Sequence, residues 1–212
     1  GGILPYIFII FCFMGAMYPA IDLGAGEKER GTLETLLIAP ATRIEILMGK
    51  FGVITLSGLL SAMICFLGIF VSIQFVDEIP EEVIKIGLDL LQPSIVLQIL
   101  TLMIPIALLF SSLLLILSIY AKSFKEAQSI MGPLQIIVIF IIIIGTMPGI
   151  TLNLKTVWIP ILNVSLAMND IISGTLSYSL YFFVVLSLLF FTFCSIWLSI
   201  KFMSREDVIF RG

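Results

Sequence analysis

Residues 27–50 read EKERGTLETLLIAPATRIEILMGK, and this charged stretch separates two long apolar runs. Its first half carries apolar side chains at i, i+3 and i+4, which places them on one face of a helix: Leu33, Leu36 and Leu37. Polar and charged residues occupy the other faces. We therefore predict a short amphipathic helix over about 27–39. A helix of this kind on the polar side of a membrane protein lies on the lipid surface or docks in a groove of a soluble partner.

The second half of the stretch predicts a break followed by a new helix. Pro40 ends the amphipathic helix, because its ring cannot continue the hydrogen-bond ladder. Thr42 and Glu45 have the Thr-x-x-Glu spacing of a capping box, which starts the next helix. A second box, Ser123 with Glu126, predicts a helix that begins at about Phe124.

The composition indicates an integral membrane protein. Of the 212 residues, 60% are hydrophobic and only 12% are charged, whereas a soluble domain carries about 25% charged residues. Five stretches contain no charged residue, and each is long enough to cross a bilayer: 1–21, 51–76, 90–121, 127–154 and 171–200. We predict an all-α, polytopic transmembrane domain over 1–212, with spans at about 3–22, 50–74, 94–119, 125–147 and 178–201.

The distribution of basic residues predicts the orientation. With the N-terminus outside, nine Lys and Arg residues fall on the inner side: Lys28, Arg30, Arg43, Lys50, Lys122, Lys125, Lys201, Arg205 and Arg211. Only Lys85 and Lys155 fall on the outer side. Because cytoplasmic loops are enriched in Lys and Arg, the stretch 27–50 and the C-terminus are expected in the cytoplasm.

Residues 148–177 form the second unusual region. Fourteen uncharged residues lie between Lys155 and Asp170, too few to cross the bilayer. We predict a re-entrant region of two short helices that dip into the outer leaflet and return. Trp158 is expected near the outer interface, as part of an aromatic belt.

Several chemistries are absent from the sequence. The chain has no His, which removes His-ligated metals and His general bases. It has no Gly-x-x-x-x-Gly-Lys-Ser/Thr phosphate loop, so it cannot itself bind and hydrolyse ATP as a P-loop ATPase does. No charged residue is predicted deep in a span, whereas ion-coupled transporters carry such residues along their pathway. A membrane domain without a phosphate loop and without charged residues along a pathway, but with an amphipathic helix that can dock a partner, indicates that another protein supplies the energy.

Three stretches resemble a known family. The run 27–37 with Pro40 and Gly49-Lys50 resembles the first cytoplasmic loop of type-2 (ABC-2 type) ABC transporter permeases, and within them the sodium-extruding, NatB-like branch. The runs IPILNVSLAMND (159–170) and SREDVIF (204–210) resemble the same branch. Such permeases have a further membrane helix and an extracytoplasmic domain ahead of the matching region. We therefore expect the chain, which starts Gly-Gly-Ile-Leu-Pro, to be the C-terminal part of a longer permease.

The resemblance implies a role for the predicted amphipathic helix, as the coupling helix that inserts into an ATPase subunit. Its expected coupling residues are Glu27, Glu29, Arg30, Gly31, Thr32, Leu33, Glu34, Leu36 and Leu37. ATP and magnesium are expected on that cytoplasmic ABC ATPase, and no cofactor on this chain. The other expected partners are a second permease copy, in a homo- or heterodimer, and the lipid bilayer, with no nucleic acid. The implied location is a prokaryotic plasma membrane.

Other functions remain open at the level of sequence. Within the family, drugs, lipids or peptides are alternatives to sodium or another small cation as the exported substrate. From a different class, Glu81-Glu82 is similar to the paired glutamates of CAAX-type membrane proteases, although the Arg spacing and every His of those enzymes are missing. A membrane docking or sensor protein could use the same amphipathic helix.

Overall fold

The five apolar stretches form five long helices in the computed structural model, which describes residues 4–32, 41–75, 92–147 and 149–203. No strand occurs in these ranges. The helical elements are α1 (Leu4–Ile21), the π-helix η1 (Asp22–Gly26), α2 (Glu27–Glu29), α4 (Arg43–Phe75), α6 (Pro93–Tyr120), α7 (Phe124–Gly145), the 3₁₀ turn η2 (Thr156–Trp158), α8 (Leu162–Ser173) and α9 (Tyr178–Met203). The predicted all-α membrane fold is confirmed, because five of these helices are long and apolar enough to span a bilayer.

Two of the predicted spans are shorter than the helices that contain them. The first was expected to end near residue 22, but α1, η1 and α2 run on as one continuous helix to Glu29. The second was expected to start near residue 50, whereas α4 begins at Arg43. The cause at Arg43 is the capping box: Thr42 N–H donates to Glu45 Oε2 over 2.7 Å and Glu45 N–H donates to Thr42 Oγ1 over 3.2 Å. The other three spans agree with prediction within a few residues.

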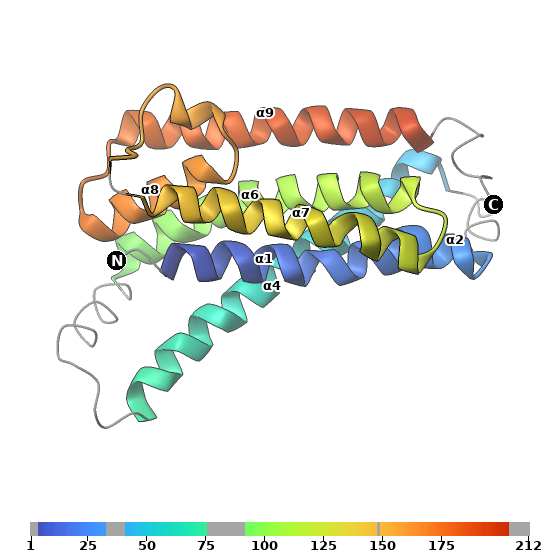
Figure 1. Ribbon diagram of the computed structural model, residues 1–212, viewed down its shortest axis with the longest axis horizontal. Helices are drawn as coiled ribbons and strands as arrows, with labels where there is room; N and C mark the ends of the chain where they lie inside the picture. Colours follow the sequence, from blue (N-terminus) through green and yellow to red (C-terminus); the bar gives the residue numbers. More distant parts are fainter. Residues whose placement is uncertain (1–3, 33–40, 76–91, 148, 204–212) are drawn as a thin grey trace.

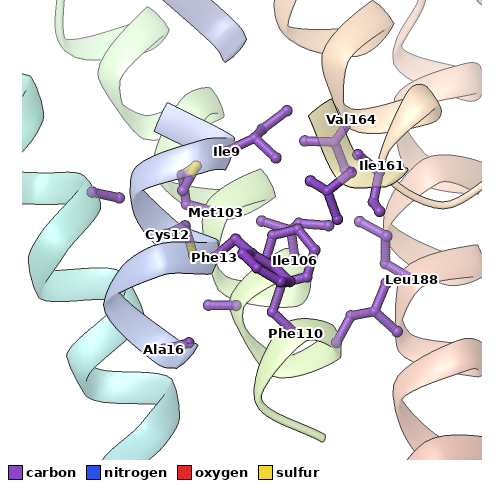
Figure 2. Packing of buried hydrophobic residues seen from close by; sticks show 14 of the residues in the cluster. Ile9, Cys12, Phe13, Ala16, Met103, Ile106, Phe110, Ile161, Val164 and Leu188 are labelled. Carbon is purple, nitrogen blue, oxygen red and sulfur yellow. The ribbon is translucent and has the colours of Figure 1, made fainter. Parts of the chain in front are cut away.

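The helices α1 and α6 form the centre of the bundle, with α4, α7, α8 and α9 around them (Figure 1). Figure 2 shows the core where α1, α6, α8 and α9 meet. Phe13 of α1 and Phe110 of α6 pack edge to face there, with ring centroids 5.2 Å apart. Both side chains are fully buried. The two helices are therefore held together by a tightly packed aromatic contact.

Small residues bring α1 and α4 into close contact. A Cβ added to Gly58 would lie 2.9 Å from the carbonyl oxygen of Cys12, and one added to Gly15 would lie 2.1 Å from Ser61 Oγ. Only small residues allow membrane helices to approach this closely. Toward Phe75, α4 diverges from the bundle (Figure 1). An apolar cavity of ≈ 220 Å³ lies between α1, α4 and α6 and is lined by side chains such as Phe8, Phe66 and Met103.

The region predicted as re-entrant folds back along α9. The carbonyl of Val157 accepts hydrogen bonds from Ser187 Oγ at 2.9 Å and from Asn163 Nδ2 at 2.8 Å. Ser187 lies nine residues into α9, or about 14 Å from its first residue at 1.5 Å per residue. Irregular backbone at such a depth is tolerated where it is buried against protein, and here the carbonyl of Val157 is paired with side chains of α8 and α9. Two short helices, η2 and α8, are present in this region.

Trp158 packs beside the middle of α9. Its ring packs edge to face on Phe190, with centroids 6.5 Å apart, and Phe190 is about 18 Å along α9 from the first residue. That Trp158 lies near the outer membrane interface stays a prediction.

The basic residues gather at one end of the bundle, which we call the charged end. It contains α2, the start of α4, the turn between α6 and α7, and the end of α9 (Figure 1). Of the Lys and Arg residues in the described ranges, all except Lys155 lie at this end or next to it: Lys28, Arg30, Arg43, Lys50, Lys122, Lys125 and Lys201. The separation of charge that the sequence predicts is thus present in the structure.

Candidate functional site

The predicted coupling residues begin at the charged end, where the helix that starts at Leu4 ends. Glu27–Glu29 are its last residues, and Arg30 and Gly31 form a turn in which Gly31 has φ +70°. Gly is favoured just past a helix because this left-handed conformation costs it little. The predicted start of a separate helix at Glu27 is therefore not observed. Four of the expected coupling residues lie outside the described residues: Leu33, Glu34, Leu36 and Leu37. The part of the predicted 27–39 helix that contains them therefore stays a prediction. Glu81 and Glu82 also lie outside the described residues.

Glu27 forms a buried ion pair with Lys50 of α4. Lys50 Nζ lies 2.5 Å from Glu27 Oε2 and also donates to the carbonyl of Leu23 over 2.6 Å. The side chains of Lys50 and Glu27 are only 8% and 18% exposed. A buried charge is tolerated only when it is paired and hydrogen-bonded. This pair therefore joins the end of the first helix to the beginning of α4.

Lys28 and Glu29 bind the two helix ends that flank the turn between α6 and α7. Lys28 Nζ donates to the carbonyls of Ile119 and Ala121, at 3.0 and 3.3 Å. Glu29 Oε2 accepts a hydrogen bond from the backbone N–H of Phe124 at 2.7 Å. The cation thus lies at the C-terminal end of α6 and the carboxylate at the N-terminal end of α7. Each charge has the sign that the helix dipole favours.

Arg30 and Thr32 close the end of the helix on its exposed side. Arg30 Nη1 pairs with Asp22 Oδ1 at 2.8 Å, and Thr32 Oγ1 donates to the carbonyl of Glu27 over 3.2 Å. Hydrogen bonding and charge attraction from Asp22 raise the pKa of Arg30 above its ordinary value. Because both members of this ion pair are about half exposed, it contributes little to stability.

The helix also contains a π-helical turn, η1, directly before Glu27. Ser118 of α6 lies against it: its Oγ accepts a hydrogen bond from Ala25 N–H at 2.9 Å and donates to the carbonyl of Ile21 at 3.3 Å. Ser118 is fully buried. Glu27 to Glu29 are therefore connected to α4, α6 and α7, while η1 is connected to α6.

Part of this arrangement could be predicted from the sequence, and the rest could not. Glu27, Glu29 and Arg30 were expected to contact a partner, which stays a prediction; in the structure their side chains bond within the chain. No contact within the chain was expected for Lys50 or Ser118. Lys50 stands directly before a long apolar run, but a Lys at the end of a membrane helix ordinarily extends toward water, so the sequence did not predict its ion pair. Ser118 had no signal, since nothing in the sequence relates it to a turn more than 90 residues away.

The comparisons with known proteins agree with this architecture. Residues 3–173 match the family described as "ABC-2 family transporter protein". The chain is also 30% identical over 174 residues to the "ABC transporter permease protein NatB" of Bacillus subtilis (strain 168). The match covers 81% of this chain but only 44% of that relative, so the chain spans less than half of the relative's length. No solved structure matches the chain. Five apolar helices, the charged turn after the first of them and a family match over most of the sequence lead to one assignment: the chain belongs to the ABC-2 family of transporter proteins.

Proposed function

We propose that the chain is the membrane-spanning part of the permease subunit of an ATP-driven ABC exporter, and that the segment after Glu29 docks on a separate cytoplasmic ATPase. Family membership supports the class of transporter. The missing phosphate loop supports a separate ATPase, because this sequence has no P-loop for nucleotide. ATP and magnesium would then bind to the partner, and a second permease copy would complete the assembly.

One observation carries the proposal: the last turn of the first helix is bonded to three other spans. Glu27 contacts α4 through Lys50, Lys28 contacts the end of α6, and Glu29 contacts the start of α7. A partner that pulls or pushes the chain beyond Arg30 would act on all of these helix ends together. That is the property required of a segment that transmits an ATPase's motion to a membrane bundle.

The substrate is a further part of the proposal. The resemblance of residues 27–50 and 159–170 to the sodium-extruding branch supports sodium or another small cation. Drugs, lipids or peptides are the alternatives within the family. Inverted vesicles that contain the complete transporter should take up radioactive sodium when ATP is supplied. Uptake that is equal with and without ATP would exclude sodium as the substrate.

The docking role is tested by co-purification of the ATPase with the permease. The apolar face at Leu33, Leu36 and Leu37 is predicted to fill a groove on the ATPase, and burying one Leu is worth roughly 1.5–3 kcal/mol. Leu33→Ala/Leu37→Ala should therefore weaken the complex by about two orders of magnitude or more. The matched control is Leu56→Ala/Leu60→Ala, which removes two exposed Leu side chains from α4. Equal ATPase recovery with both variants and with the unmodified permease would contradict the proposal.

A further inference from the structure

The π-helical turn η1 encloses the side chain of Ser118, which comes from α6. In a regular α-helix, Ala25 N–H would donate to the carbonyl of Ile21, four residues earlier. Ser118 Oγ occupies the place between these groups and bonds to both. Further along, the N–H of Glu27 reaches the carbonyl of Asp22, five residues back, which is the π pattern. Insertion of a side chain into the i→i−4 ladder and π-bulges are both known causes of helix distortion, and π-bulges are frequent at functional sites.

Gly24 provides the space that Ser118 needs. A Cβ added to Gly24 would lie 2.1 Å from Ser118 Oγ and 2.6 Å from Ser118 Cβ. No side chain larger than hydrogen fits at residue 24 while Ser118 stays in place. The glycine and the serine thus act as a pair, and we call Gly24, Ala25, Ile21 and Ser118 the serine bridge.

The serine bridge determines which way the charged residues after it face. Each residue of an α-helix turns the chain by about 100°, and a π-bulge contains one residue more than the regular turn. If Ala25 bonded directly to Ile21, the chain after the bridge would rotate by about 100° relative to the present arrangement. Glu27 would no longer face Lys50, and Glu29 would no longer face the N–H of Phe124, because both contacts depend on direction.

We infer that Ser118 is a positioning residue, which holds the first helix in the π register and thereby orients residues 27–32. This role rests on the proposed function only in that residues 27–32 lead into the docking segment. The regular α register is the alternative state of the same helix, because Ile21 and Ala25 can satisfy each other when the hydroxyl leaves. The serine bridge is therefore a hinge between the membrane bundle and the segment that leaves it.

The test measures the rotation directly. In the complete permease in lipid nanodiscs, with its native cysteines replaced, spin labels are placed at Thr32 and Gln128, which are both exposed. Pulsed electron resonance gives the distance between the labels. Ser118→Ala removes the bridging hydroxyl, and Gly24→Ala displaces it. Each variant should shift the main distance by about 5 Å or more, since side chains lie about 5 Å from a helix axis.

Matched controls separate rotation from general damage. Ser112→Ala removes another buried hydroxyl of α6, one that bonds to the carbonyl of Leu109 within its own helix. Gly52→Ala adds a methyl group where nothing lies within 4 Å. Both controls should leave the distance unchanged. An unchanged distance in Ser118→Ala would overturn the inference, and if that variant does not fold, Gly24→Ala decides in the same way.

The same samples keep this inference separate from the proposed function. Binding of the ATPase is measured for the unmodified permease and for each variant. If the unmodified permease does not bind the ATPase, the proposed function fails while the distance measurement still decides the register. If the label distance shifts in Ser118→Ala and ATPase binding falls with it, the positioning role is supported. A shift in distance with full ATPase binding would still support the role of Ser118 in setting the register, and would show that docking of the ATPase does not require that register.

Discussion

At the scale of single residues, the pair of Lys50 and Glu27 joins the first helix to α4 through two charges that are largely shielded from water. Both side chains are mostly buried, and Lys50 Nζ also binds the carbonyl of Leu23. Removing one partner of a buried pair leaves the other charge uncompensated, which costs about 3–5 kcal/mol. Lys50→Met should therefore lower the free energy of unfolding by about that amount, measured by unfolding in mixed micelles.

A variant that lacks both charges is the control for this prediction. Replacing both members, as Lys50→Met/Glu27→Leu, removes the charges together and should recover most of the loss, because two apolar side chains leave no unpaired charge. A double variant as unstable as Lys50→Met alone would show that the cost comes from packing. The exposed pair of Arg30 and Asp22 offers a contrast, since Arg30→Met should leave the free energy of unfolding almost unchanged.

At the scale of elements, the first turn of α7 is capped from two directions. Ser123 Oγ accepts from Glu126 N–H at 3.2 Å, while Glu29 accepts from Phe124 N–H. Losing an N-cap hydroxyl costs about 1 kcal/mol. Ser123→Ala should therefore speed amide exchange in the first turn of α7 by about fivefold.

Glu29→Gln tests the second cap of α7, which comes from the end of the first helix. It keeps an acceptor near Phe124 but removes the negative charge from the N-terminal end of α7, a change worth about 0.3–1 kcal/mol. Its effect on exchange should be smaller than that of Ser123→Ala. A larger effect for Glu29→Gln would mean that the contact between helices, rather than the local cap, holds the start of α7.

At the scale of the whole molecule, the distribution of charge predicts how the bundle is inserted. Lys125 lies at the charged end, whereas Lys155 lies in the segment that follows the other end of α7, and both are exposed. By the preference for Lys and Arg on the cytoplasmic side, Lys125 should face the cytoplasm. In a variant without the three native cysteines, Lys155→Cys should react with an impermeant maleimide added outside intact cells. Lys125→Cys should react only after the cells are opened, and labelling of both from outside would contradict the orientation.

The sequence by itself determined the features that depend on neighbouring residues. Long charge-free runs predicted the five spans, because crossing a bilayer needs about 20 apolar residues in succession. The boxes at Thr42 and Ser123 predicted where α4 and α7 begin, since a cap involves residues only three apart. Both hydrogen bonds of the box at Thr42 are observed. At Ser123 the hydroxyl accepts from Glu126 N–H, while the Glu126 carboxylate accepts from the N–H of Lys122.

Only the tertiary structure decided the features that join distant residues. The sequence could not show that Ser118 would interrupt the first helix, that Glu29 would cap α7, or that Trp158 would pack midway along α9. Each of these contacts joins elements that lie far apart in the sequence, and the pattern of apolar and charged residues does not show which of them meet. Periodicity fixes which face of a helix is apolar, but the rotation and depth at which two helices meet depend on how their side chains fit together.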